Sequence, residues 1–355
     1  MNQTIRLTER TISPDLSILA ALKLMDQLAV KSLAVCQEAN LIAGVLSIGD
    51  IQRAIIGGIN LNHEVRRILR PNPRVLYPDH SESKAKDMMV KYRMEFLPIV
   101  NPETREIIKV YFWSDFFPEK IIGPAQQFHL PVVIMAGGLG TRLKPLTNVL
   151  PKPLIPLGDK TIIEHILDRF AMHGCSKFYL SVNYKADFIE YYLKEQHLSY
   201  EIKYFRENHP LGTAGSLSLL KGKINQTFFV SNCDILIEQD YSEILDYHRA
   251  NHNELTIVAA LRHYPIPYGI VETGDNGTLI SLAEKPEFTF KINSGMYLLE
   301  PQLLNEIPDG QFFHITDLIQ KIKNRQGIVG VYPVSEKSWK DVGDWEEYLK
   351  SSKIL

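Results

Sequence analysis

The chain has 355 residues, of which 45% are apolar and 23% charged, and its formal net charge at pH 7 is −2. This composition is typical of a globular protein with a sizeable core, and the length predicts two or three domains. Since the near-neutral charge gives no global field toward a nucleic-acid polymer or an anionic membrane, any anionic ligand needs local cations and backbone dipoles.

The cysteines and the first residues bear on the compartment. Cys36, Cys175 and Cys233 are far apart and lack the Cys-x-x-Cys spacing of a structural zinc site, so neither such a site nor a disulfide framework is expected. Residues 1–10 are polar and lack the apolar core of a signal peptide, and no apolar run approaches the ~20 residues that span a bilayer. We therefore expect a cytoplasmic protein without a membrane partner.

The first third of the chain contains a weak internal repeat. The order helix, strand, strand, helix occurs twice, with a register of about 64 residues. The segments are 21–28, 32–36, 41–47 and 49–56 in the first copy, and 85–90, 96–100, 107–112 and 114–115 in the second. Paired repeats of this kind usually pack against each other, so residues 1–62 and 63–120 are expected to complete one core.

Residues 121–130 are expected to be a linker, because the pattern changes after them. From residue 131 to the end, short apolar strands alternate with amphipathic helices. The expected strands are 132–136, 178–182, 228–231 and 255–261, and the expected helices are 162–172 and 189–195. This alternation predicts an open, mostly parallel α/β sheet. Residues 268–284 have the pattern of a hairpin added to that sheet.

A glycine-rich loop at residues 136–147 follows the first buried strand. Gly137, Gly138 and Gly140 permit close approach of the backbone, so several N–H groups can point at a phosphate chain, and Arg142 adds a multi-donor cation. The loop lacks the Gly-Lys-Ser/Thr ending of a Walker A motif, and Leu143 occupies the third glycine position of a dinucleotide fingerprint. A plain structural turn is the alternative.

Lys152 follows this loop and stands between two prolines, in Leu150-Pro-Lys-Pro-Leu154. The prolines stiffen the backbone on both sides, which fixes the origin of the lysine side chain. A rigid surface loop is the alternative, but the two neighbouring segments together point to a site for phosphates.

The stretch 132–157 closely resembles the signature of sugar nucleotidyltransferases, the family that makes nucleotide-sugars such as GDP-mannose, UDP-glucose and dTDP-glucose. The resemblance continues in the expected order through residues 132–355. It includes Leu211-Gly-Thr-Ala-Gly-Ser216, Asn232-Cys-Asp-Ile235, Glu284-Lys-Pro286, Asn293-Ser-Gly-Met-Tyr297 and Trp339-Lys-Asp-Val-Gly-Asp-Trp345. It implies a Rossmann-like, mostly parallel mixed sheet of the glycosyltransferase-A-like kind over residues 131–355.

The resemblance also implies a role for each matching residue. The nucleotide is assigned to Ala136, Gly137, Gly138, Gly140, Thr141, Gly212, Thr213 and Gly215; catalysis to Arg142, Lys152 and Lys285, of which Lys285 holds the incoming sugar phosphate; contacts to the sugar to Gly269, Glu284 and Asn293; and Mg²⁺ to Asp234 and Asp341. The chemistry fits, because two unit charges ~4 Å apart repel by roughly 4 kcal/mol at an effective dielectric constant near 20. Bringing a sugar phosphate against a triphosphate therefore requires gathered cations.

Several of these residues have a structural alternative. Asp234 could simply begin a turn after its strand, and Glu284 with Lys285 could be an ordinary solvated pair. Asp344 could cap a helix over residues 345–350, or could be the second metal ligand in place of Asp341.

Residues 1–120 resemble a tandem pair of CBS domains, a Bateman module, which often binds adenosyl ligands between its copies. The ribose-binding signature of that family is matched by Ser47 and Asp50, whereas the second copy has Phe112 in place of the hydroxyl residue before Asp115. The resemblance implies at most one site for an adenine or guanine nucleotide. Asp50 could instead only cap a helix, and the module could only mediate dimerisation, so a homo-oligomer is expected.

The pairing of the two parts resembles the glucosamine-1-phosphate guanylyltransferases of legionaminic-acid-type pathways. That resemblance favours GTP with glucosamine-1-phosphate or a related hexose-1-phosphate, although UTP, CTP or dTTP stays open as the donor. Two rival classes remain: a dinucleotide-dependent oxidoreductase, against which Leu143 and the Pro-Lys-Pro segment argue, and a non-catalytic nucleotide sensor.

Overall fold

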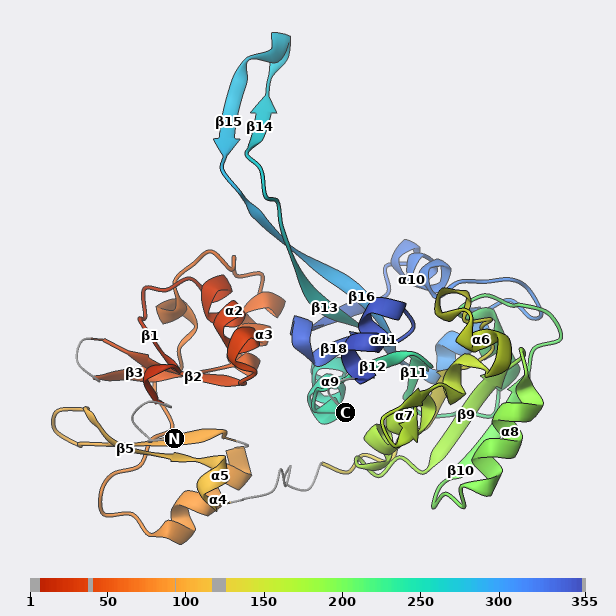
Figure 1. Cartoon of the computed structure of the whole chain (residues 1–355), viewed down its shortest axis with the longest axis horizontal. Coiled ribbons are helices and arrows are strands. Elements are labelled where there is room, and N and C mark those ends of the chain that lie inside the picture. Colours follow the sequence, from red (N-terminus) through yellow and green to blue (C-terminus); the bar gives the residue numbers. More distant parts are fainter. Residues whose placement is uncertain (1–6, 38–40, 93, 117–125, 353–355) are drawn as a thin grey trace. The chain divides into compact units, whose positions relative to one another are not determined.

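The computed structural model describes residues 7–37, 41–92, 94–116 and 126–352 and falls into two compact units, Met1–Pro124 and Ala125–Leu355 (Figure 1). Residues 121–125 of the expected linker lie outside the described residues, as do the expected domain ends at 1–6, 117–120 and 353–355. The rest of the expected linker packs on the second unit, where the Phe128 ring stacks on His173 with centroids 5.0 Å apart.

The first unit contains the two expected copies. Their elements are α2 (Ile18–Leu28), β2 (Ser32–Cys36), β3 (Ile42–Ser47) and α3 (Ile48–Ile56), then α4 (Glu82–Tyr92), β4 (Phe96–Val100), β5 (Ile107–Phe112) and α5 (Trp113–Phe116), with β1 (Thr11–Ile12) and a 3-10 turn, η2 (Val65–Ile68), in addition. In each copy the two strands pair antiparallel. Cys36 of the first copy and Phe96 of the second belong to one buried apolar cluster, so the copies share a core as the repeat predicts.

The second unit is built on a seven-stranded sheet of order β10-β9-β6-β11-β16-β13-β17. Its strands are β6 (Val132–Met135), β9 (Lys177–Val182), β10 (Glu201–Arg206), β11 (Phe228–Asn232), β13 (Leu255–Pro265), β16 (Glu287–Leu299) and β17 (Val329–Val334). Only β16 runs antiparallel to its neighbours, and the other pairings are parallel. The sheet is therefore the mostly parallel mixed sheet that the sequence predicts.

Helices and short elements complete the second unit. They are α6 (Leu146–Val149), α7 (Ile162–Ala171), α8 (Ala186–Glu195), α9 (Tyr241–Ala250), α10 (Ile315–Asn324) and α11 (Trp345–Ser352), with small pairs β7 (Pro156–Leu157) with β8 (Lys160–Thr161) and β12 (Ile235–Ile237) with β18 (Trp339–Asp341). Further 3-10 turns are η3 (Thr141–Leu143), η4 (Lys152–Leu154), η5 (Gly215–Leu220), η6 (Asp275–Gly277), η7 (Pro301–Glu306) and η8 (Glu336–Ser338). None of the helices in the described ranges is long and apolar enough to cross a membrane.

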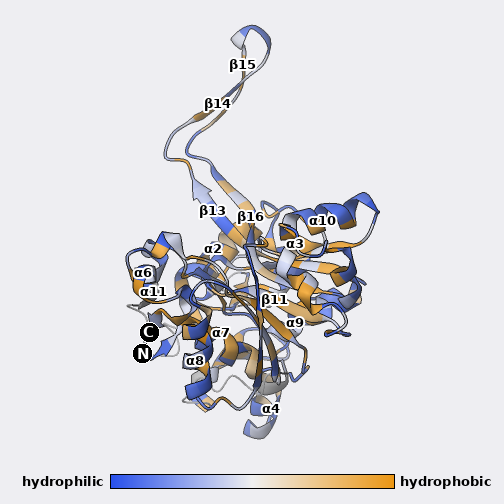
Figure 2. Cartoon of the chain, turned by 90° about the vertical axis from the view of Figure 1, so that its right-hand side faces the viewer, coloured by the Kyte–Doolittle hydropathy of each residue, from blue (hydrophilic) through white to orange (hydrophobic). Residues whose placement is uncertain are grey.

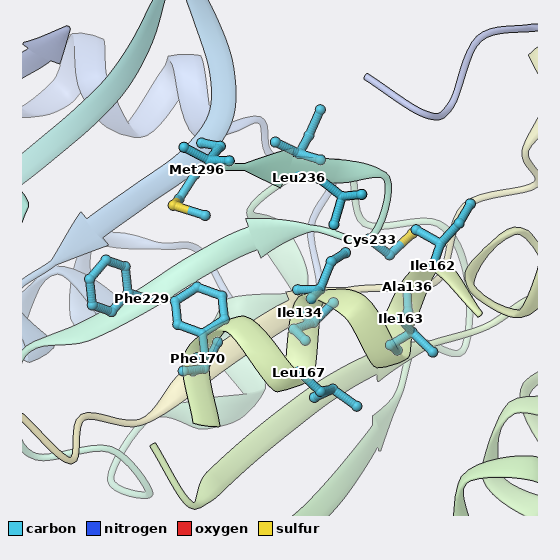
Figure 3. Packing of buried hydrophobic residues seen from close by; sticks show 14 of the residues in the cluster. Ile134, Ala136, Ile162, Ile163, Leu167, Phe170, Phe229, Cys233, Leu236 and Met296 are labelled. Carbon is cyan, nitrogen blue, oxygen red and sulfur yellow. The ribbon is translucent and has the colours of Figure 1, made fainter. Parts of the chain in front are cut away.

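The core lies between the sheet and its helices. The four residues of β6 are a continuous apolar run in the interior of the sheet, next to its middle strand β11. Helix α7 begins at a capping box between Thr161 and Glu164 and buries Ile163 and Phe170. Figure 3 shows Phe170 beside Phe229 of β11, and their ring centroids are 5.2 Å apart.

The expected hairpin at 268–284 forms, but its expected place in the main sheet is wrong. Strands β14 (Ile270–Thr273) and β15 (Leu279–Ala283) pair only with each other and make a separate two-stranded sheet. This sheet continues the outer halves of β13 and β16 and extends away from the rest of its unit (Figures 1 and 2). We call residues 262–290 the arm. A turn sequence is enough to specify the local hairpin. Joining the main sheet also requires an unpaired strand edge beside the hairpin, and among the described residues no strand of the main sheet extends as far as β14 and β15.

Candidate active site

Two parallel neighbouring strands end at the candidate site. Strands β6 and β11 pair in parallel from Val132 and Phe229 onward, so the glycine-rich loop after β6 and Asp234 after β11 lie at one edge of the sheet. Strand β12 starts directly after Asp234 and pairs antiparallel with β18, with Ile235 opposite Asp341. The pairing of these short strands brings two distant carboxylates side by side.

Lys152 and Asp234 form a buried ion pair. The lysine lies in η4, where only 9% of the residue is exposed, and its Nζ donates to Oδ2 of Asp234, which is 5% exposed. Desolvating two charges is costly, and such pairs persist only when the surrounding structure holds them together. The rigid Pro-Lys-Pro segment therefore fixes an ammonium group at the carboxyl edge of the sheet.

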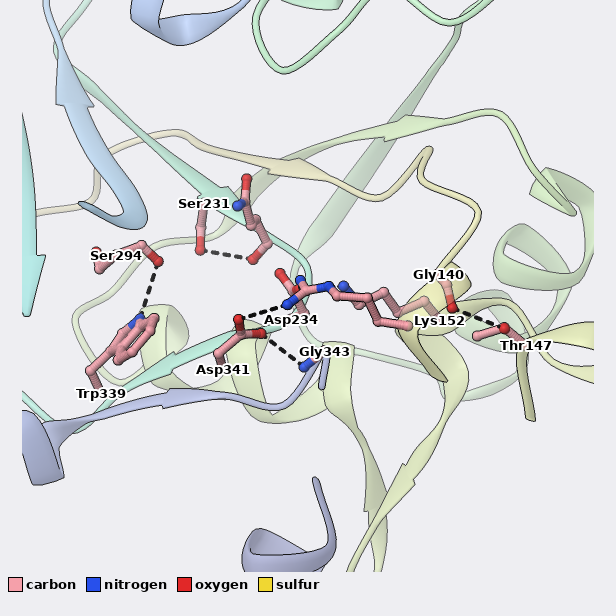
Figure 4. A network of polar contacts seen from close by, with 11 residues as sticks. Gly140, Thr147, Lys152, Ser231, Asp234, Ser294, Trp339, Asp341 and Gly343 are labelled. Atoms are coloured by element: carbon pink, nitrogen blue, oxygen red, sulfur yellow. Dashed lines mark hydrogen bonds and ion pairs between the residues drawn. The ribbon is translucent and has the colours of Figure 1, made fainter. Parts of the chain in front are cut away.

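Arg142 joins this pair to the second carboxylate. Its Nη2 lies 3.4 Å from Oδ2 of Asp234 and its Nη1 donates to Oδ2 of Asp341 at 3.1 Å. Figure 4 shows Asp234 and Asp341 near each other, with Lys152 and Gly343 beside them. Burial lowers the pKa of Arg142, but the two carboxylates raise it more, so the pKa lies above its usual value. About half of its side chain, 54%, is exposed. We call Arg142, Lys152, Asp234 and Asp341 the charge cluster.

Two glycines make room for the charge cluster. A Cβ on Gly343 would overlap the Asp234 carboxylate and lie 2.9 Å from Cε of Lys152, while its N–H donates to Oδ1 of Asp341 at 3.0 Å. Gly140 has φ +64° and a Cβ there would lie 3.0 Å from Cβ of Lys152. Gly343 was missed by the sequence reasoning, and its only signal was its place between two aspartates of the Trp339–Trp345 segment.

Asp344 plays the structural role that was its alternative. Its Oδ1 accepts a hydrogen bond from the backbone N–H of Glu346 at 3.0 Å, which caps the start of α11. It still faces the same cleft of about 250 Å³ as Asp341, a cleft whose lining also includes Arg142. Asp341 accepts from Arg142, and its role as the second metal ligand stays a prediction.

The predicted nucleotide loops adjoin each other through Glu207. Its Oε2 accepts from the backbone N–H of Leu211 at 3.0 Å, and a Cβ on Gly137 would lie 3.2 Å from its Oε1. Gly138 has open space around it, since nothing would lie within 4 Å of a Cβ at this position. Glu207 was missed because it belongs to no motif of the resemblance. Its two contacts hold the two loops together.

Part of the second loop has a packing role. Gly212 has φ +80°, and a Cβ there would lie 2.7 Å from the carbonyl oxygen of Phe313. A Cβ on Gly215 would lie 2.5 Å from the carbonyl oxygen of Gln311, and Oγ1 of Thr213 accepts from the N–H of Ile315 at 3.0 Å. The small residues therefore dock this loop on the segment before α10, and their contact with a nucleotide stays a prediction. The remaining two residues assigned to the nucleotide are Ala136, which is buried, and Thr141, which opens η3.

The residues predicted for the sugar phosphate fall in two places. Asn293 lies in β16 on the side of the charge cluster, because the carbonyl of the next residue, Ser294, accepts from Nε1 of Trp339 at 3.2 Å and Trp339 precedes Asp341 by two residues. Gly269, Glu284 and Lys285 lie on the arm and are exposed. No carboxylate among the described residues pairs with Lys285, and the structure does not bring these three residues to the charge cluster.

In the first unit, Asp50 is used within its own fold. Ser47 and Asp50 form a capping box at the start of α3, and Asp50 also accepts from Arg53 and from Nε of Arg70 at 2.8 Å. Burial raises the pKa of this carboxyl, but hydrogen bonds from Ser47 and Arg70 lower it more. In the second copy, Asp115 accepts from the backbone N–H of Phe112 at 2.8 Å. These contacts support the cap, and binding of a nucleotide by Ser47 and Asp50 stays a prediction.

Within the part of the chain that the structure describes, no three His, Cys, Asp or Glu side chains gather in a way that could hold a metal alone. Asp234 and Asp341 offer two carboxylates near each other, which fits Mg²⁺, since this ion commonly takes one or two carboxylates together with waters and phosphates. Cys36, Cys175 and Cys233 form no disulfide and are buried.

Comparisons with known proteins agree with this geometry. Residues 131–355 match the family model described as nucleotidyl transferase, and residues 8–57 match the CBS domain model. The chain is 32% identical over 228 residues to a mannose-1-phosphate guanylyltransferase of Mycobacterium tuberculosis, covering 63% of this chain and 64% of that protein, and 32% identical over 234 residues to mannose-1-phosphate guanylyltransferase 1 of Arabidopsis thaliana, with the same coverage. The chain thus spans under two thirds of the length of these curated relatives.

A solved structure is also similar. The crystal structure of HddC from Yersinia pseudotuberculosis complexed with GMP-PN superposes with a TM-score of 0.51 at 26% identity, covering 63% of this chain and 99% of that one. Of the two family models, one covers nearly all of the second unit and the other covers residues 8–57 of the first.

Proposed function

The chain belongs to the nucleotidyl transferase family, and on that premise we propose that it joins a nucleoside triphosphate to a sugar 1-phosphate and releases pyrophosphate. The observation that carries the proposal is the charge cluster at the carboxyl ends of β6 and β11, beside the glycine-rich loop. A ligand in an open α/β sheet binds at that edge.

The charge cluster is electrically balanced by itself. Arg142 and Lys152 carry two positive charges, and Asp234 and Asp341 carry two negative charges. A triphosphate that enters brings several more negative charges, so a divalent cation held by the two carboxylates fits the arrangement. Bound there, Mg²⁺ would supply charge neutralisation at the phosphates. Lys152 and Arg142 would then be free to pair with phosphate oxygens instead of carboxylates.

The reaction needs no histidine base. An oxygen of the sugar phosphate attacks the α-phosphorus in line, a new phosphorus–oxygen bond forms, and the bond to the leaving pyrophosphate breaks. The attacking oxygen already carries negative charge, so no proton has to be removed. Arg142 stabilises the charge that develops on pyrophosphate, and Lys152 neutralises phosphates at the reacting centre.

GTP is the donor that the relatives favour, because they are guanylyltransferases and HddC was solved with GMP-PN. For the acceptor, the relatives favour mannose-1-phosphate, whereas the two-part organisation favours glucosamine-1-phosphate. A nucleotide in the CBS module, a homo-oligomer and a cytoplasmic location stay predictions.

The test measures pyrophosphate release with GTP, ATP, UTP, CTP and dTTP, each against mannose-1-phosphate, glucosamine-1-phosphate and glucose-1-phosphate, with Mg²⁺ and with EDTA. We expect the highest rate with GTP, abolished by EDTA, and a product with the mass of a GDP-hexose. Thermal stabilisation by nucleotides without pyrophosphate release in any combination would overturn the proposal in favour of a nucleotide sensor.

A further inference from the structure

The arm exposes a large apolar surface. Its exposed apolar side chains are Tyr264, Tyr268, Val271, Leu279, Ile280, Leu282, Phe288 and Phe290, with exposures from 42% to 74%. A two-stranded ribbon alone is marginally stable in water, and exposed apolar patches larger than those of ordinary surfaces mark interaction sites. The arm therefore requires a cover that its own unit does not provide.

One face of the arm is an aromatic stripe. Tyr264 stands opposite Phe288 in the ribbon, and the Tyr264 and Phe290 ring centroids are 5.9 Å apart. Arg262 stands opposite Phe290, at the base of the arm, with its guanidinium 5.4 Å above the Trp339 ring. Because Arg262 also lines the cleft of Asp341, the stripe begins at the candidate active site and runs outward along the arm.

The cleft is short of positive charge for a second phosphate. Its charged lining consists of two cations and four carboxylates, namely Arg142, Arg262, Asp341, Asp344, Glu346 and Glu347. The lysine predicted to hold the sugar phosphate, Lys285, is on the exposed arm beside Glu284. The cleft of one chain thus lacks a cation for the sugar phosphate unless the Lys285 of an arm reaches it.

We propose that a second copy of this chain covers the arm and that Lys285 of the partner subunit completes the active site. Two arms that pack antiparallel through their aromatic stripes satisfy the isologous symmetry of a dimer. Lys285 precedes β16, and the chain from it to Phe290 spans at most roughly 16 Å at the rise of a strand. A two-fold axis near Phe288, midway between them, places each arm's lysine beside the base of the other arm, where the cleft lies.

This inference rests on the proposed function, since it assigns Lys285 to the sugar phosphate. Lys152→Met and Lys285→Met chains, each with strongly reduced activity alone, are co-expressed with different tags and purified through both tags in turn. In a mixed dimer, one of the two sites combines an intact cleft with an intact arm, so about half of wild-type pyrophosphate release is expected. Activity as low as that of either parent overturns the proposal in favour of an arm that acts within its own chain. Failure to recover any mixed dimer overturns it as well.

A second experiment separates failure of the inference from failure of the proposed function. If the wild-type protein releases no pyrophosphate, the function fails and the arm is judged by cross-linking alone. Phe288→Cys in the full chain is treated with a short bis-maleimide, and Phe188→Cys, at an exposed phenylalanine of α8, is the control, because the three native cysteines are buried. We expect a dimer band from Phe288→Cys only. Absence of that band overturns the pairing of arms.

Discussion

The charge cluster and the arm carry residues assigned to one reaction, yet they lie in opposite surroundings. Lys152 and Asp234 are buried, paired and crowded by Gly343, whereas Glu284 and Lys285 are exposed on a two-stranded ribbon. In the charge cluster, we expect chemistry and stability to depend on the same contacts. On the arm, a lysine can contribute to the reaction without contributing to the stability of the fold. Substitutions in the two regions test this difference.

The largest effect is expected from Lys152→Met. Loss of this cation should lower kcat/KM by about 10³-fold or more, as for other cations that stabilise transferred phosphates. Because Asp234 then stays buried with one partner fewer, the free energy of unfolding should also fall by about 3 kcal/mol. Pyrophosphate release and urea denaturation measure the two quantities. A variant with lower activity but unchanged stability would show that the buried pair does not couple them.

Lys285→Met sharpens the comparison from the other side. We expect kcat/KM for the sugar phosphate to fall by about 10²-fold, as when one preorganised contact to a reacting oxyanion is removed. The free energy of unfolding should change by less than about 0.5 kcal/mol, as usual at the surface. Lys291→Met, at an exposed lysine of the same ribbon, is the matched control and should retain activity. Equal activity of the two variants would remove Lys285 from the site.

Asp341→Asn tests the metal assignment within the charge cluster. Loss of one carboxylate should raise the Mg²⁺ concentration for half-maximal activity by about tenfold or more. Asp344→Asn is the control, since asparagine caps a helix about as well as aspartate and should leave the Mg²⁺ requirement near that of the wild type. The reverse outcome would make Asp344 the ligand and Asp341 only a partner of Arg142.

Gly343→Ala separates space from charge. The added Cβ would overlap the Asp234 carboxylate, so the Trp339–Asp341 strand must shift and we expect a loss of about 1–3 kcal/mol in the free energy of unfolding. Gly138→Ala should leave that free energy unchanged, because nothing lies within 4 Å of its Cβ. Denaturation curves of the two variants measure both free energies of unfolding. Equal stability would mean that the charge cluster accommodates the added Cβ without strain.

Much of the fold could be predicted from local patterns. The apolar run of β6 predicts a buried central strand, and the recurrence of Ser32–Cys36 as Phe96–Val100 predicts the repeat. Strands β10 and β17, at the two edges of the sheet, were missed: β10 contains charged residues, and β17 contains Gly330 and Pro333, which are typical of turns. Local signals thus predict what each segment is and leave open where it pairs.

The candidate site divides in the same way. Lys152 and Asp234 were predicted because each lies within a motif, and the structure pairs them. Gly343 and Glu207 matter because segments far apart in sequence meet at them. No short sequence pattern therefore predicts either residue. The hairpin before Lys285 was predicted, but its separation from the main sheet was not, because a motif specifies the type of a residue and not the place of its segment in the fold.

The smallest effect is expected in the first unit, where Asp50 is a buried carboxylate that serves the fold. Its folded-state pKa is lowered, so its stabilisation is present above the unfolded value of about 3.9 and is lost as pH falls through the folded value. Asp50→Asn should lower the free energy of unfolding by about 1 kcal/mol at pH 7, with the difference shrinking below about pH 4. Asp87→Asn, at an exposed position of α4, is the control. If the loss of unfolding free energy in Asp50→Asn is independent of pH, the ion pair with Arg70 contributes nothing to stability. The carboxylate would then be more available to a ribose than its contacts indicate.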